Sequence, residues 1–264
     1  MTYVFKHIKD ASPPPTHLVY KAPKSDLLRA EPLKDSVDLR PVSCPIYNQG
    51  SIGSCTANAI AFLFWYAMKT QYKTEFQLSR LFQYYWSRWF YSQQSVLQDT
   101  GARISDAMKV LKTFGVAPES DQPYVVTKFA LPPPDQALTN SNLYYATKYS
   151  AVPQDIDTIK SVLARGYPIA FGIQVYSSFQ SQAANATDVI PMPNTATERL
   201  LGGHAVVLVG YDKTRFIVRN SWGTNMQDKG YFYLPYEYVK STSLSNSFWI
   251  LESVYNRGLV LSSR

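Results

Sequence analysis

The chain has 264 residues and a formal net charge of +7; 45% of its residues are apolar and 17% are charged. This composition excludes a disordered chain, and at about 150 residues per domain it predicts one or two domains with a sizeable core. No apolar run approaches the roughly 18–20 residues of a bilayer-spanning helix. The charged N-terminus lacks the apolar stretch of a signal peptide. We therefore expect neither a signal peptide nor contact with a membrane.

Cys44 and Cys55 are the two cysteines of the sequence. Two cysteines are too few to staple a chain of this length, so stability must come from the core, and cytoplasmic, lysosome-like and virion compartments all stay open. The positive charge is not concentrated in runs of five or six basic residues. We therefore expect a solvated basic surface, no nucleic-acid partner and a monomer.

Residues 1–36 differ in character from the rest of the chain. A proline run at residues 13–15 interrupts any helix, because proline lacks the backbone N–H donor and fixes its own φ angle. Apolar side chains such as Phe5 and Tyr20 still give this segment a surface to bury. It predicts an extended arm that docks on the body of the protein.

Helical patterns come first in the body and strand patterns follow from about residue 123. Apolar side chains surround the segment from Cys55 to Met68, the pattern of a central buried helix that begins at Cys55. The remaining predicted helices cover residues 78–90, 105–114 and 154–165, and the predicted strands cover residues 168–175, 205–211, 215–218, 230–234 and 248–254.

Cys55 stands where the buried helix is expected to begin, after the Gly53-Ser54 turn. The unpaired N–H groups and the dipole at a helix N-terminus favour an anion, so they lower the pKa of a thiol toward the reactive thiolate. A lone cysteine is more often a small buried apolar side chain. Its position alone therefore does not establish a catalytic role.

His204 starts one predicted strand and Asn220 follows the next strand. The connection between these strands is short, as in a hairpin. Antiparallel pairing then places residue 220, 221 or 222 opposite His204, so Asn220 can lie on the same face and orient the imidazole. A structural histidine at a polar hairpin end would produce the same pattern.

Gln49 and Trp222 complete the candidate site. Gln49 lies on the loop that enters the helix, where its amide and the Cys55 backbone N–H can form a two-donor hole for an oxyanion. Trp222 is close enough to Asn220 in sequence to cover a His204–Asn220 bond from water. Each signal is weak alone, but together they fit one mechanism of nucleophilic catalysis.

At these residues the sequence resembles the papain-like, cathepsin-type cysteine peptidases. The histidine and asparagine follow the cysteine by about 150 and about 165 residues, near the family spacing of roughly 130–150. The resemblance covers residues 37–250. The stretches that carry it are Gln49-Gly50-Ser51, Gly53-Ser54-Cys55, His204-Ala205 and Asn220-Ser221-Trp222-Gly223.

The resemblance implies a hydrolase that cuts polypeptides without a metal or cofactor and that is made as a zymogen. Cys55 is then the nucleophile and His204 the base and later the acid, and the two meet across a cleft as an ion pair. Asn220 orients the imidazole, Gln49 stabilises the oxyanion, and Trp222 shields the His204–Asn220 bond.

Two glycines are assigned to substrate binding by the resemblance. Gly101 matches a glycine that hydrogen-bonds the substrate backbone, and Gly203 stands where many relatives carry Asp or Asn. The sequence also departs from the family pattern, because Ile52 replaces the first signature cysteine and Thr56 replaces an aromatic residue. These departures leave all four catalytic positions intact but alter the shape of the pocket.

The fold implied is α+β and papain-like, with a helical left half, a β-barrel-like right half and the active site in the cleft between them. The helical domain would span residues 37–122 and supply the nucleophile, and the β-rich domain would span residues 123–240 and supply His204 and Asn220. Residues 1–36 form the arm, and residues 241–264 form a C-terminal strand that crosses back and a tail.

An endopeptidase is favoured over an exopeptidase, because exopeptidase relatives carry a histidine pair that this chain lacks. An acyl-transfer enzyme of the transglutaminase-like kind and a peptidase-fold binding protein are the alternatives. Relatives are made as zymogens whose longer, helical pro-segment runs backwards through the cleft. We expect the shorter arm to lie over the cleft or its rim and to restrain activity, although a strap that only stabilises the body would fit the sequence equally well.

Overall fold

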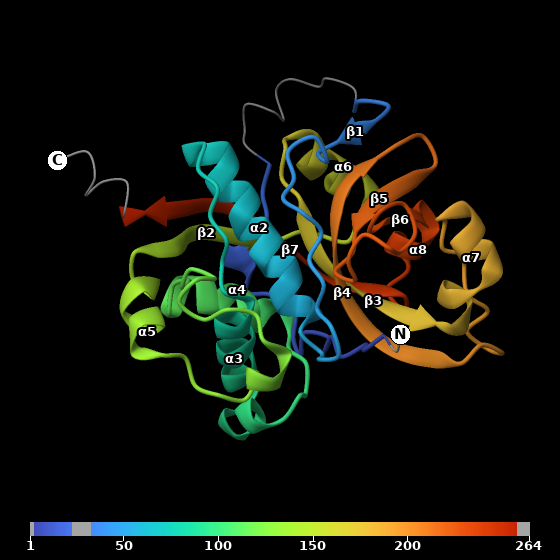
Figure 1. The fold of residues 1–264 in the computed structure, drawn as a ribbon. Coiled ribbons are helices and arrows are strands. Elements are labelled where there is room, and N and C mark those ends of the chain that lie inside the picture. Colours follow the sequence, from blue (N-terminus) through green and yellow to red (C-terminus); the bar gives the residue numbers. More distant parts are fainter. Residues whose placement is uncertain (1–2, 23–32, 258–264) are drawn as a thin grey trace.

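The computed structural model describes residues 3–22 and 33–257. Parts of the expected arm (1–2 and 23–32) and of the expected tail (258–264) lie outside the described residues. The helices between residues 55 and 141 lie toward one side of the molecule, and most strands lie on the other side together with the later helices (Figure 1), which confirms the α+β fold class. Across the residues described, no helix has the length and apolar character needed to cross a membrane.

The long predicted helices are present. The central helix continues to Tyr72, four residues beyond Met68, and the ends of the other long helices differ from the predicted ends by at most two residues. The short helices α5, α7 and α8 were not predicted, because none is long enough to show a helical repeat of apolar residues. The helices are α2 (Cys55–Tyr72), α3 (Arg80–Tyr91), α4 (Ile104–Thr113), α5 (Asp135–Ser141), α6 (Ile156–Ala164), α7 (Gln182–Thr187) and α8 (Tyr236–Lys240).

The strands of the described chain form one antiparallel sheet in the order β2-β7-β3-β4-β5-β6, with β1 paired to β4. The last strand, β7, lies between β2 and β3 and so crosses back as expected. Strand β4 begins well before residue 205, because β3 extends to Tyr176 and pairs with it. The strands are β1 (Val37–Asp38), β2 (Tyr144–Ala151), β3 (Ile169–Tyr176), β4 (Leu200–Tyr211), β5 (Arg215–Arg219), β6 (Tyr231–Pro235) and β7 (Ser245–Asn256).

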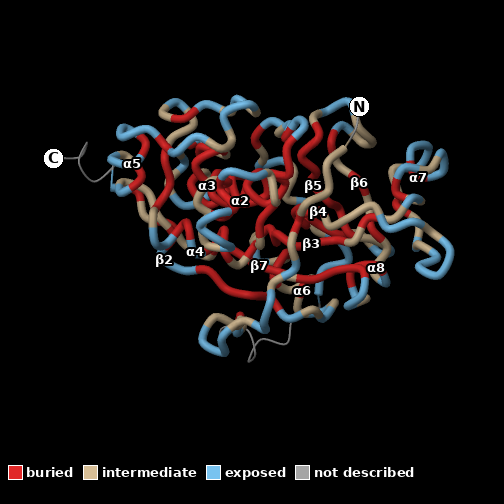
Figure 2. Tube along the Cα trace, turned by 90° about the horizontal axis from the view of Figure 1, so that it is seen from below, coloured by how far each residue is buried: buried red, intermediate tan, exposed pale blue. Residues whose placement is uncertain are grey.

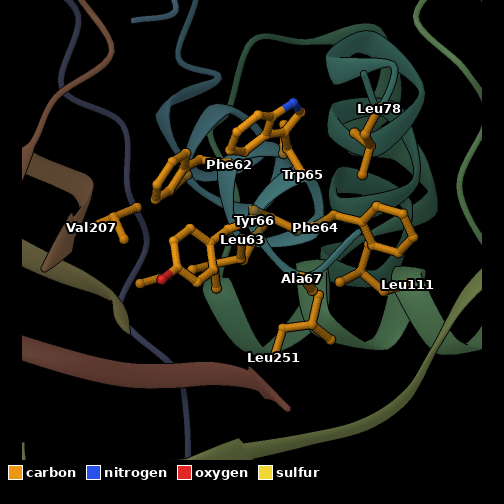
Figure 3. Packing of buried hydrophobic residues seen from close by; sticks show 14 of the residues in the cluster. Phe62, Leu63, Phe64, Trp65, Tyr66, Ala67, Leu78, Leu111, Val207 and Leu251 are labelled. Carbon is orange, nitrogen blue, oxygen red and sulfur yellow. The ribbon is translucent and has the colours of Figure 1, made fainter. Parts of the chain in front are cut away.

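Helix α2 is central, as its all-round apolar pattern predicts. Every side chain from Cys55 to Met68 is buried, because α3 and α4 cover one flank of the helix while β4 and β7 lie against the other. Figure 3 shows Phe62 on the side of Val207 and Phe64 on the side of Leu111. The buried trace in Figure 2 runs along α2 and the strands, while exposed segments lie at the periphery. One helix therefore ties the two sides together.

Phe64→Ala is expected to lower the free energy of unfolding by about 3–5 kcal/mol, because it removes a fully buried aromatic ring and leaves a cavity. Denaturant unfolding followed by circular dichroism measures the change. Leu97→Ala is the matched control, since Leu97 is 72% exposed, and it should change stability by less than about 0.5 kcal/mol. Equal losses in both variants would contradict the central role of α2.

Candidate active site

Cys55 is the first residue of α2, and none of its surface is exposed. Burial raises the pKa of its thiol, and hydrogen bonds from the backbone of Ala205, Lys6 and Thr56 lower it by less. The amides therefore support a thiolate, as expected at a helix N-terminus, but desolvation is the larger effect. In this state Cys55 is a neutral thiol.

His204 lies in β4, opposite Ile173 of β3. Its Nε2 is 2.8 Å from Asn220 Oδ1, and its ring stacks on Trp222 with centroids 4.6 Å apart. Burial lowers the pKa of His204 to about 4; the Asn220 hydrogen bond opposes this shift, and the charge of His7 adds to it. The imidazole is therefore neutral near pH 7.

The hydrogen bonds around Asn220 fix the tautomer of the imidazole. The backbone N–H of Ser221 donates to Asn220 Oδ1 at 2.8 Å, so this atom is the amide oxygen. Nε2 of His204 must then carry the proton that it donates to the same oxygen. Nδ1 is left as an unprotonated acceptor, and it has no hydrogen-bond partner among the described residues. The histidine is thus prepared as a base.

Cys55 and His204 meet in the same buried pocket, because the amide that follows His204 hydrogen-bonds the Cys55 thiol. The expected ion pair is nevertheless not the state of this structure. Burial raises the pKa of the thiol and lowers the pKa of the imidazole, so both groups are neutral. Desolvation disfavours separated charges. The N-terminal arm contributes to it, because Phe5 packs against the His204 ring and the Lys6 backbone hydrogen-bonds the Cys55 thiol.

Gln49 is fully buried, and hydrogen bonds from several segments hold it in place. Its Oε1 accepts from Ser221 Oγ at 2.7 Å, and its backbone N–H donates to Ser221 O at 2.8 Å. The side-chain amide donates to Val4 O at 3.2 Å and to Ile52 O at 3.1 Å. Ser221, which the motif contains but to which no role was assigned, therefore aims the amide of Gln49.

The arm runs through the candidate site as an extended strand. Tyr3 stacks on Trp222 with ring centroids 4.3 Å apart, and Phe5 packs edge-on against Trp222 and His204. Beyond these rings, His7 N donates to Gly203 O at 2.8 Å. The arm therefore seals both the imidazole and the thiol from water.

Gly101 and Gly203 form the walls on either side of this strand. A Cβ on Gly101 would lie 1.6 Å from Lys6 O, and one on Gly203 would lie 2.4 Å from His7 O. Ile8 N donates to Ala102 O at 3.2 Å, next to Gly101. Both glycines predicted to contact a bound chain therefore lie against main chain here, and a side chain at either position would close the groove.

Two side-chain pairs in the cleft were not predicted. Lys6 Nζ lies 2.8 Å from Asp99 Oδ2, and His7 Nε2 lies 3.1 Å from Asn246 Oδ1. Each pair joins residues that are far apart in sequence and follow no periodic pattern. The sequence offered one indication of these pairs: Asp99 lies two residues before Gly101, which was predicted to bind substrate.

The described part of the chain holds no cluster of three or more His, Cys, Asp or Glu residues suited to a metal ion. Cys44 and Cys55 are both free thiols. Cys44 is buried beside Arg219, whose Nη2 lies 3.4 Å from its sulfur, so it is placed away from the arm. The nucleophilic, basic and amide groups that meet in the cleft are those of Cys55, His204, Asn220 and Gln49.

Comparisons with known proteins identify the family of this chain. The sequence pattern of the papain family of cysteine proteases matches residues 33–249, so the chain belongs to this family. This confirms the papain-like fold.

Two proteins are similar over most of this chain. Xylellain, a cysteine protease from Xylella fastidiosa, superposes with a TM-score of 0.85 at 37% identity, over 94% of this chain and 96% of that one. An uncharacterized peptidase C1-like protein of Acanthamoeba polyphaga mimivirus is 39% identical over 219 residues, 78% of this chain and 69% of the viral protein. A probable cysteine protease of Arabidopsis thaliana, RD21C, is 30% identical, and the match spans 43% of its length.

Docking of the arm is expected to weaken as the pH falls. Burial lowers the pKa of His7, while Asn246, the charge of Asp10 and the Ala102 backbone raise it by less; His204 is the other titratable group that it faces. Docked His7 thus binds a proton less readily than free His7. The contribution of His7 to docking is therefore complete above the pKa of free His7, about 6.5, and is lost below it. The equilibrium constant for docking should fall by up to about tenfold between pH 7.5 and 5.5.

Hydrogen exchange of the His7 and Ile8 amides, corrected for intrinsic rates, measures this loss of docking. His7→Gln is the control, because its amide retains a donor for Asn246 but does not titrate. Protection in the control should not vary over this pH range. A wild type whose protection is equally constant would contradict the role of His7.

Proposed function

We propose that this protein is a cysteine endopeptidase that acts through Cys55, His204 and Asn220, with Gln49 in the oxyanion hole. The observation that carries the proposal is the fixed tautomer of His204, whose Nδ1 is left unprotonated. The backbone of Ala205, the next residue, hydrogen-bonds the Cys55 thiol. A neutral imidazole held in this way is the base that a thiol nucleophile requires.

The reaction follows from these positions. His204 Nδ1 takes the proton of Cys55, and the thiolate attacks a peptide carbonyl. The oxyanion accepts hydrogen bonds from Gln49 Nε2 and the Cys55 backbone N–H. The proton on His204 then passes to the leaving amine as the C–N bond breaks. Water next attacks the thioester carbonyl while His204 takes its proton, and the C–S bond breaks to release the acid as the proton returns to the Cys55 sulfur. The contact between Gln49 and Val4 O supports this role, since a main-chain carbonyl already reaches that amide.

The path of the arm supports an endopeptidase. Residues of the arm contact Trp222 on one side of the thiol and Gly101 and Gly203 on the other. A groove that holds main chain on both sides of the nucleophile can accept an internal segment of a polypeptide. We propose polypeptide substrates on the same grounds.

The arm restrains this activity because it fills the groove in the direction opposite to a substrate. His204 delivers its proton to the leaving amine, so the leaving group lies on the side of Trp222 and the acyl group on the side of Gly101. A substrate therefore runs from Gly101 toward Trp222, whereas the arm runs from Tyr3 at Trp222 to His7 at Gly203. No peptide bond of the docked arm is oriented for cleavage.

Cys55→Ala is expected to abolish hydrolysis, with kcat/KM for a peptide substrate falling by about 10³-fold or more, because no other group forms the acyl-enzyme. A fluorogenic peptide assay and labelling by an irreversible epoxide inhibitor measure the two consequences. Cys44→Ala, at the other buried thiol, is the matched control and should retain both labelling and cleavage.

Three outcomes would contradict this assignment. A wild type that neither cleaves peptides nor reacts with the epoxide would indicate a peptidase-fold binding protein. Transfer of the acyl group to an added amine in preference to water would indicate an acyl-transfer enzyme. Labelling lost equally in Cys44→Ala would place the nucleophile elsewhere.

Replacing Tyr3 and Phe5 together by serine is expected to raise kcat/KM by about tenfold or more, because each aromatic contact contributes about 0.5–1.5 kcal/mol beyond its buried area. Deleting residues 1–36 should act in the same direction, but it also removes the hydrogen bond from Tyr20 N to Ala151 O on the body. The double substitution is therefore the cleaner test.

Leu131→Ser serves as the control for the double substitution, since Leu131 is exposed and distant in sequence from both the arm and Asp99. Its kinetics should match those of the wild type. Kinetics that stay unchanged in the Tyr3 and Phe5 variant, while its arm amides lose protection from hydrogen exchange, would show that the arm is a strap without a regulatory effect.

A further inference from the structure

Asp99 is a carboxylate held in place at the edge of the cleft, two residues before Gly101. Its Oδ1 accepts from Gly53 N at 2.8 Å and from the hydroxyl of Tyr84. The Tyr84 hydroxyl in turn accepts from Gly101 N at 3.0 Å. The side chain of Asp99 is 18% exposed, and Gly53 N also donates to its Oδ2 at 3.1 Å. These bonds fix the orientation of the carboxylate. The loop that carries Gly101 is thereby tied to the turn before Cys55.

Oδ2 of Asp99 also faces a cation of the arm. Lys6 Nζ lies 2.8 Å from Asp99 Oδ2 and donates to Asp99 O at 2.6 Å. The other nearby cation, Arg88, is fully buried and donates to the backbone carbonyls of Val96 and Gln98. Arg88 is therefore directed at main chain, and the cation that meets the carboxylate from the groove is that of Lys6.

The position of Lys6 identifies the part of a substrate that Asp99 would meet. The backbone of Lys6 hydrogen-bonds the Cys55 thiol, and the Lys6 side chain lies against Gly53 and Gly101. This is the side opposite Trp222, where the acyl part of a substrate lies. The walls of a pocket do not depend on the direction of the chain inside it, so the reversed arm still shows which side chain the pocket accepts.

We infer that Asp99 is a specificity-determining residue that selects substrates with lysine or arginine at the residue supplying the scissile carbonyl. This inference rests on the proposed peptidase function. Lys6 is then a mimic of the substrate side chain, and the arm and the substrate compete for the same carboxylate. A charge-assisted hydrogen bond from the bound cation to a preorientated carboxylate provides the selectivity.

Three fluorogenic peptides that differ only at this residue, with lysine, norleucine or glutamate, test the inference on the full chain. Norleucine keeps the aliphatic stem of lysine and removes its charge. Arm occupancy lowers kcat/KM by the same factor for every substrate, so the ratio between two substrates does not depend on it. The wild type should cleave the lysine peptide at least about tenfold better than the norleucine peptide, and the glutamate peptide least well.

Asp99→Asn should reduce the lysine-to-norleucine ratio to about one, because Oδ1 can still accept from Gly53 and Tyr84 while the charge is lost. Asp157→Asn, an exposed carboxylate at the start of α6, is the matched control and should keep the wild-type ratio. Asp99→Glu is a second variant that advances the carboxylate into the groove, and it should shift the preference from lysine toward the shorter ornithine.

A wild-type ratio near one, or a ratio that survives in Asp99→Asn, would overturn the inference while leaving the peptidase intact. If Asp99→Asn does not fold, an unchanged order of lysine and ornithine in Asp99→Glu overturns it equally. A wild type that hydrolyses none of the three peptides would overturn the proposed function, and the specificity with it.

Discussion

The chemistry of the cleft depends on the hydrogen bonds that join the loop before α2 to the segment after β5. Gln49 N donates to Ser221 O at 2.8 Å, and Gly223 N donates to Tyr47 O at 2.9 Å. Cys55 and Gln49 come from one side of this junction and His204 and Asn220 from the other. Because the junction is made largely of main chain, it fixes the distance between the two sets of side chains with little dependence on neighbouring side chains.

Exclusion of water from the cleft has opposite effects in the arm-bound and the substrate-bound states. With the arm docked, the Cys55 pKa is raised and the His204 pKa is lowered to about 4, so neither group is charged. The same low polarity strengthens hydrogen bonds to an oxyanion once a substrate replaces the arm. In the proposed mechanism, the docked arm therefore favours the neutral protonation state of both groups through desolvation.

Much of the fold and the central part of the candidate site could be predicted from the sequence. Long helices such as α2 carry a strong apolar repeat, and Cys55, His204 and Asn220 lie in motifs with characteristic neighbours. Strand β2 was missed because register shifts interrupt its alternation of buried and exposed side chains. The contact between Lys6 and Asp99 was missed because nothing in either local sequence indicates that residues 93 positions apart meet.

The arm and the body belong to one covalent chain, and this determines how the arm competes with a separate peptide for the cleft. Because both belong to one chain, occupancy of the groove is a first-order equilibrium, and dilution of the protein does not empty it. A tethered segment acts at an effective concentration in the millimolar range for short flexible connections. A separate peptide with the arm's sequence, which meets the cleft only by collision, would have to be supplied at comparable concentration to occupy the groove as fully.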